Sequence, residues 1–114
     1  MIFTDEQLAR AGVRIRHHFG DDGSKVYIKE TFIPAGVRLP LHSHTFTHKS
    51  VLASGRALLR VGGDASRIAD LRILTIPQGT QHEIEAETDC TWLCIHATDE
   101  ADAEYIDMTL VEAA

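Results

Sequence analysis

The sequence predicts an all-β protein, an antiparallel sandwich or barrel preceded by one short helix. Short segments rich in β-branched and aromatic residues follow one another from residue 13 onward. Turn residues separate these segments at intervals of about 8–12 residues, the spacing typical of antiparallel sandwiches and barrels. Because a domain averages about 150 residues, the 114 residues predict a single domain, 1–114.

Each expected element has a local signal. Thr4 has the character of a helix N-cap, with Gln7 as its capping-box partner and Gly12 as the end of the helix. Apolar and polar residues then alternate, and this pattern predicts strands over 13–19, 26–33, 37–44, 48–53, 56–61, 71–76, 82–86, 90–97 and 104–111. The stretch 64–70 is ambiguous between a loop and a weak helical turn.

The charge balance argues against two classes of partner. Seventeen acidic residues against eleven basic ones give a net charge of -6, which repels a phosphate backbone or an anionic membrane surface. No apolar run approaches the ~18 residues of a membrane span, and the first residues lack the features of a secretory signal. We therefore expect a cytoplasmic protein that binds neither nucleic acid nor membrane.

Histidine is the residue type that points to chemistry, since the chain has seven. His42 and His44, two residues apart on a strand, project from the same face with Cα atoms ~6.6 Å apart, so both can bind one metal ion at ~2.0–2.1 Å. His48 lies ~20 Å from His42 along a straight strand, so it joins such a site only if the chain turns at residues 45–47. His82 follows a Pro-Gln-Gly turn and begins another expected strand.

Two segments resemble the motifs of the cupin superfamily. Residues 36–55 have the form of the first motif, Gly36, five residues, His42-Ser43-His44, three residues, His48, six residues and Gly55. Residues 71–86 resemble the second motif through Pro77-Gln78-Gly79-Thr80-Gln81-His82. The 15 residues between them match the shortest spacing usual in small single-domain, RmlC-like cupins. The resemblance implies a cupin-type antiparallel jelly-roll β-barrel.

The resemblance also implies a metal site. His42, His44 and His82 stand at ligand positions, and His48 stands where the family has a glutamate ligand. A neutral imidazole there raises the charge of a divalent site from about +1 to +2, which increases Lewis acidity and attracts an anion. Four imidazoles suit Fe, Zn, Ni or Cu better than Mn. Alternatively, His48 stands beside a three-histidine metal and acts as general base.

Two classes of function remain open. The first is a metal-dependent enzyme acting on a small, anionic molecule, a dioxygenase or a lyase/isomerase, because cupins host all of these reactions. The alternative is a non-catalytic module that binds a metal or a small ligand, as a sensor or a store. By the same resemblance we expect a homodimer, formed through sheet faces or by exchange of the terminal segments 13–19 and 104–111.

The remaining histidines are expected to have structural roles. His17 and His18 flank a hairpin and are expected to be exposed. His96 shares strand parity with Cys90 and Cys94, so it points into the barrel, where we expect a packed or supporting role rather than ligation. The two cysteines lie ~13 Å apart on one strand, beyond the ~7 Å limit for a disulfide, and are expected to be reduced core residues.

One pair of carboxylates is expected to take no part in the chemistry. Glu83 and Glu85 alternate with Ile84 on the strand that His82 begins. Successive strand side chains point to opposite faces, so these carboxylates are predicted to face away from His82.

Overall fold

The computed structural model describes residues 5–41 and 48–97, which form one short α-helix, one 3₁₀ turn and nine strands. The elements are α1 (Asp5–Arg10), β1 (Arg14–His18), η1 (Gly20–Asp22), β2 (Val26–Ile33), β3 (Arg38–Leu41), β4 (His48–Ser54), β5 (Arg56–Val61), β6 (Asp64–Ala69), β7 (Arg72–Ile76), β8 (His82–Ala86) and β9 (Cys90–Ala97). No helix in this part of the chain is long and apolar enough to cross a membrane.

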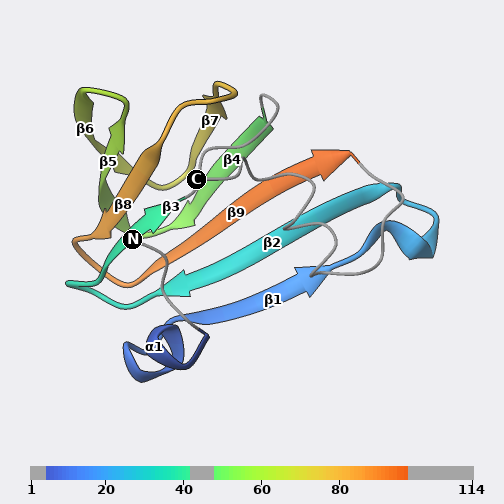
Figure 1. The fold of residues 1–114 in the computed structure, drawn as a ribbon, viewed down its shortest axis with the longest axis horizontal. Helices are drawn as coiled ribbons and strands as arrows, with labels where there is room; N and C mark the ends of the chain where they lie inside the picture. Colours follow the sequence, from blue (N-terminus) through green and yellow to red (C-terminus); the bar gives the residue numbers. More distant parts are fainter. Residues whose placement is uncertain (1–4, 42–47, 98–114) are drawn as a thin grey trace.

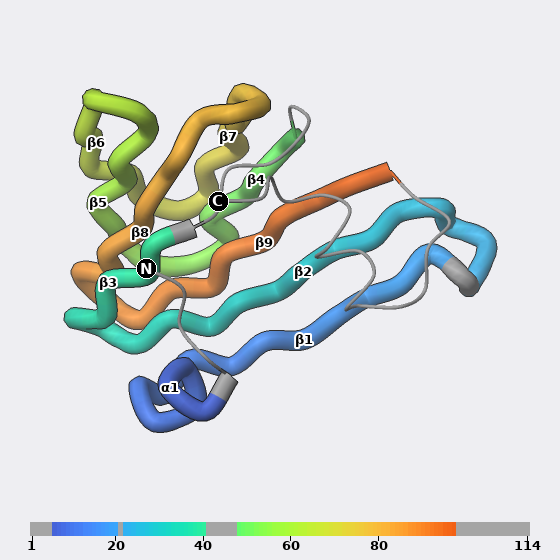
Figure 2. The backbone as a smooth tube through the Cα atoms, in the orientation of Figure 1, coloured from blue at the N-terminus to red at the C-terminus, as the bar shows by residue number. Residues whose placement is uncertain are grey.

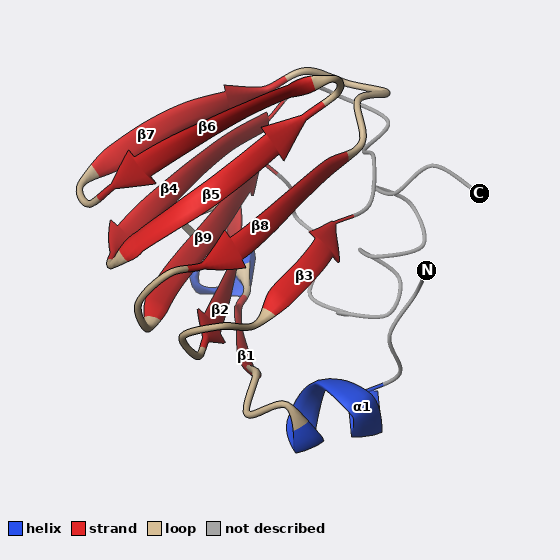
Figure 3. Ribbon diagram, turned by 90° about the vertical axis from the view of Figure 1, so that its left-hand side faces the viewer, coloured by secondary structure: helices blue, strands red, loops and turns tan. Residues whose placement is uncertain are grey.

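The strands form two antiparallel sheets that face each other (Figure 3). The five-stranded sheet has the order β1-β2-β9-β4-β7, and the four-stranded sheet has the order β3-β8-β5-β6. Strands distant in sequence are therefore neighbours, as β2 and β9 are over all eight residue pairs from Val26↔Ala97 to Ile33↔Cys90. Figure 1 shows β1, β2 and β9 running on beyond the strands of the four-stranded sheet.

The core lies between the two sheets and follows from the two-residue alternation of the strands. In β9, residues 90, 92, 94 and 96 are buried, whereas those between them are partly exposed. Trp92 from this strand packs with Leu52 and Ile33 of the five-stranded sheet and with Ile84 of the facing sheet, and each is at most 1% exposed. Burial of one such side chain stabilises the fold by about 1.5–3 kcal/mol.

The predicted strand bounds agree closely with the structure, with one correction. The strands expected over 26–33, 56–61, 82–86 and 90–97 have those bounds, and the tube in Figure 2 shows their course. In the stretch 64–70, expected to be a loop or helical turn, residues 64–69 instead form β6, because the turn at Gly62-Gly63 returns the chain onto β5. Only Ile68 of this edge strand is buried, so β6 lacks the alternation by which strands are predicted. Thr4, the end of the segment 37–44 and the segment 104–111 lie outside the described residues.

Candidate metal and ligand site

His48 and His82 come together from opposite sheets. His48 is the first residue of β4 in the five-stranded sheet, and His82 is the first residue of β8 in the four-stranded sheet. Each is 4% exposed, and their ring centroids lie 6.1 Å apart with the planes inclined by 49°. Both strands thus start at the same end of the barrel and bring two buried imidazoles into contact.

These two imidazoles have the donor chemistry of a metal site, and the distance between their rings is compatible with a shared ion. A metal bound at ~2.0–2.1 Å by two ring nitrogens holds the two ring centroids within roughly 6.5 Å of each other. The separation of 6.1 Å satisfies this limit, and neutral imidazoles bind Fe, Zn, Ni and Cu well. Within residues 5–41 and 48–97, however, no group of three or more His, Cys, Asp or Glu side chains is arranged to hold an ion.

The other two predicted ligands, His42 and His44, lie outside the described residues. The residues on either side of that segment are placed. Leu41, which precedes it, pairs with His82 across β3 and β8, and His48, which follows it, contacts His82 through its ring. The chain therefore enters and leaves the segment 42–47 beside the two buried imidazoles.

His96 adds a third buried imidazole beside His48. The register of β4 and β9 pairs Lys49 with Ile95, and one residue further along this register places His48 opposite His96. The two ring centroids are 5.0 Å apart, and the other side of the His96 ring stacks on Tyr27 at 5.9 Å. The expected packed position of His96 is confirmed, whereas its contact with His48 depends on strand order and was not predicted.

The rings of His82, His48 and His96 form a row of buried imidazoles, called the imidazole row below. Tyr27 connects this row to the surface. It is 1% exposed, and its hydroxyl lies 2.7 Å from Nδ1 of His17, within hydrogen-bonding distance. His17 and His18 are exposed, as predicted. The His18 ring lies on the outer face of the sheet, where its Nε2 is 3.0 Å from a carboxylate oxygen of Glu30.

The carboxylates beside His82 in sequence are part of the outer surface, as predicted. Glu83 accepts hydrogen bonds from Arg38 at 2.7 Å and from Arg60 at 3.1 Å. The Arg38 guanidinium lowers the pKa of Glu83, with a smaller contribution from Arg60, so the carboxylate stays ionised at pH values below its ordinary pKa. Glu85 lies 3.5 Å from the same Arg60.

The two cysteines are free and buried, as expected. Burial raises the pKa of the Cys94 thiol, while a hydrogen bond from Ser50 at 3.7 Å and the nearby charge of Lys29 oppose that rise. Burial likewise raises the pKa of Cys90. Neither thiol is a ready nucleophile or metal ligand, since both act through the thiolate.

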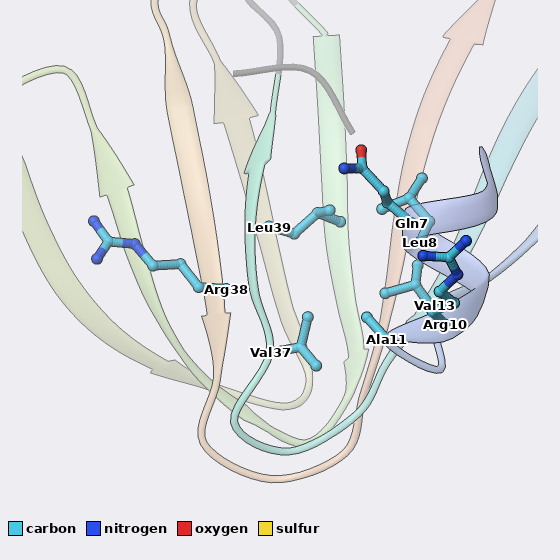
Figure 4. Close-up of a pocket in the computed structure, with 8 residues that line it drawn as sticks. All are labelled: Gln7, Leu8, Arg10, Ala11, Val13, Val37, Arg38 and Leu39. Carbon is cyan, nitrogen blue, oxygen red and sulfur yellow. The ribbon is translucent and has the colours of Figure 1, made fainter. Parts of the chain in front are cut away.

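A cavity of about 290 Å³ lies elsewhere, between α1 and β3. In Figure 4 the apolar side chains of Leu8, Val13, Val37 and Leu39 line it, while Arg38 points away to the outer face of the sheet. None of the buried imidazoles is among its lining residues. This cavity is therefore a groove beside the helix, separate from the imidazole row.

The comparisons with known proteins identify the fold. No family model and no curated protein matches the chain. Among solved structures, an RmlC-like cupin from Shewanella frigidimarina is 14% identical with a TM-score of 0.67, and the match covers 83% of this chain and 82% of that one. A cupin-2 domain from Rhodospirillum rubrum is 24% identical with a TM-score of 0.63, over 79% of this chain and 62% of that one.

A structure of salicylate 1,2-dioxygenase from Pseudoaminobacter salicylatoxidans, with gentisate adducts, is 10% identical with a TM-score of 0.65. The match covers 85% of this chain but 26% of the dioxygenase, so this chain corresponds to about a quarter of that protein. Identities this low establish the fold alone. The expected jelly-roll architecture is confirmed: the chain has the cupin fold.

Proposed function

We propose that the protein is a metal-dependent cupin enzyme that acts on a small anionic molecule, with His42, His44, His48 and His82 as ligands of a divalent Fe, Zn, Ni or Cu ion. The observation that carries the proposal is the pair of buried imidazoles, His48 and His82, that two facing sheets hold 6.1 Å apart. Leu41, the last described residue before the segment with the other two histidines, pairs with His82, and His48 is the first described residue after that segment. When bound, the ion would supply Lewis acidity and open coordination positions for a substrate.

The dioxygenase class is the reaction we favour, with a lyase or isomerase as the other reaction of the same enzyme proposal. A dioxygenase whose structure contains gentisate, an aromatic hydroxy acid, has the same fold over 85% of this chain. In this proposal the protein's own part is to fix the imidazoles, exclude water and orient the substrate. His48 and His82 begin their strands with rings 4% exposed, and Trp92 and Ile84 fill the interior on the side away from the strand starts.

Substitution of His48 tests the ligand set. His48→Glu should retain the fold and shift the metal content of the purified protein away from Cu and Zn and towards Fe and Mn, because a carboxylate is a harder ligand than imidazole. His18→Glu, at an exposed position, is the matched control and should leave metal content unchanged. Elemental analysis of both variants and of the wild type is the measurement. Identical metal content in His48→Glu and wild type would show that His48 is no ligand.

A second experiment separates an enzyme from a non-catalytic binding module. The protein is loaded with Co²⁺, whose visible absorption reports its coordination, and is titrated with azide. Four protein ligands leave open positions on a six-coordinate ion, so azide should change the spectrum saturably. A spectrum that azide leaves unchanged would indicate a closed site, and the protein would then be a metal-binding module.

A further inference from the structure

The inner face of the five-stranded sheet has a lysine beside the imidazole row. Lys29 of β2 lies two residues from Tyr27 and two from Thr31, which are 1% and 5% exposed, and strand alternation places it on the same inner face. Across β2 and β9 it pairs with Cys94, and its charge acts on that buried thiol. Lys29 is partly buried.

Hydrogen-bonding side chains flank this lysine on the same face. His17 pairs with Lys29 across β1 and β2, and the Nδ1 of His17 lies 2.7 Å from the Tyr27 hydroxyl. Tyr27 in turn stacks on His96, which contacts His48. Lys29, Tyr27 and His17 thus share one face of two neighbouring strands, and the tyrosine links this face to the proposed metal ligands.

The distribution of carboxylates makes this face suitable for an anion. Of the carboxylates on the described strands, those of Glu30, Glu83 and Glu85 lie on outer faces near arginine or histidine, and that of Asp64 is exposed on the edge strand. No carboxylate of these strands is buried between the sheets. On the inner faces of the described strands, the charged residue next to the imidazole row is therefore the cationic Lys29. The protein as a whole has a net charge of -6.

We propose that Lys29, with Tyr27 and His17 beside it, binds the carboxylate of a small organic anion whose other end lies at the imidazoles of His48 and His82. This inference rests on the proposed function for the position of the second end. Lys29 is two residues from Tyr27 along β2, and Tyr27 lies level with His96 and His48 on the neighbouring strands. Lys29 is therefore ~6.6 Å from these residues along the strand direction, the length of a molecule of a few carbon atoms. Lys29 would thereby fix which end of the substrate faces the metal.

Malonate, a three-carbon dicarboxylate, is the probe, and its neutral analogue malonamide is the control ligand. Binding is followed by the fluorescence of Trp92, the one tryptophan of the chain, which is two residues from Cys94 in the same strand. Lys29→Met should weaken malonate binding about tenfold or more, as expected for loss of a charge-assisted hydrogen bond. Lys29→Arg should weaken it less than about threefold, because the charge is retained, and malonamide should not bind.

Lys49→Met is the matched control variant. Lys49 belongs to the same sheet but is exposed and contacts Thr75 Oγ1 at 2.7 Å, so its loss removes the same charge from the other face. Its malonate affinity should equal that of the wild type. The inference is overturned if the wild type shows no saturable malonate binding, if Lys29→Met binds as tightly as the wild type, or if Lys49→Met loses as much affinity.

Two further measurements keep the result independent of folding and of the metal. In the wild-type protein, malonate should protect Lys29 but not Lys49 from acetylation, read by peptide mass spectrometry, and equal labelling of Lys29 with and without malonate overturns the inference. Titrations are run on Zn-loaded and on metal-free protein. If the wild type binds no metal, the proposed function fails, while dependence of malonate binding on Lys29 in the metal-free protein still supports the anion site.

Discussion

Gly55 is the position at which a single methyl group should be most damaging. It lies between β4 and β5, where the chain passes from the five-stranded to the four-stranded sheet, with φ of +101°. A Cβ atom there would lie 2.3 Å from the carbonyl oxygen of Asp89 and 2.8 Å from the sulfur of Cys90. The carbonyl belongs to the backbone, so the contact is relieved only if the connection before β9 moves.

Gly36 provides a matched control for Gly55→Ala. Its φ is +85°, but a Cβ atom there would meet no other atom within 4 Å. The left-handed backbone costs an alanine about 1–2 kcal/mol at either position, and overpacking adds about 1–3 kcal/mol at Gly55 alone. Gly36→Ala should therefore lower the free energy of unfolding by about 1–2 kcal/mol, and Gly55→Ala by about 2–5 kcal/mol.

Urea unfolding measures both variants. Trp92 is 1% exposed, so its fluorescence reports loss of the core. If the slope of the unfolding free energy against urea concentration is unchanged, the wild type and the variants unfold to similar states and can be compared. A domain of this size is stable by about 5–15 kcal/mol, so Gly55→Ala removes a large part of its stability. Equal losses for the two variants, or a loss below about 1 kcal/mol for Gly55→Ala, would refute the steric reasoning.

Two other predictions concern outer surfaces. Because Arg38 lowers the pKa of Glu83, the stability from this ion pair is fully present above pH 4.5, the ordinary value, and is lost as the pH falls through the lowered one. Glu83→Gln should therefore destabilise the protein at pH 7 by about 0.5–1 kcal/mol, and its difference from the wild type in urea unfolding should shrink as the pH falls below 4.5; a loss that does not change with pH would contradict this reasoning. Ile73, 65% exposed on the edge strand β7 near Leu71, is apolar surface for the expected homodimer. Ile73→Lys should shift the protein from dimer to monomer in analytical ultracentrifugation, whereas Ser66→Lys on β6, the edge strand of the four-stranded sheet, should not; dimers of equal strength in both variants would place the interface elsewhere.

Local sequence patterns predicted most of the strands because side chains alternate between a buried and an exposed face. β9 shows how strong this signal is, since residues 90, 92, 94 and 96 are buried and the predicted bounds agree with the structure. β6 shows its limit. It lies at the edge of the four-stranded sheet with Ile68 as its buried residue, so the sequence has little alternation there although Val61 and Asp64 pair across the turn.

The site was predicted less completely because its contacts depend on which strands are neighbours. The motif spacing led to His48 and His82, and the structure brings these two together. The expected metal ligation by His42, His44, His48 and His82 stays a prediction. The contact of His96 with His48 and the stack of His96 on Tyr27 arise because β9 lies between β2 and β4. No local pattern specifies that order, since it is set by the packing of the whole chain.

Strand order also changes what the acidic composition means for an anionic substrate. From the sequence, the net charge of -6 opposes an anion, and the metal alone must attract it. In the structure, Glu30, Glu83 and Glu85 lie outside, near cationic side chains. Charges beyond about 8 Å are largely screened at physiological ionic strength, whereas Lys29 lies one row from the imidazoles on the inner face. In the proposed anion site, the charge that the described strands place beside the imidazoles is therefore that of Lys29, although the protein as a whole is acidic.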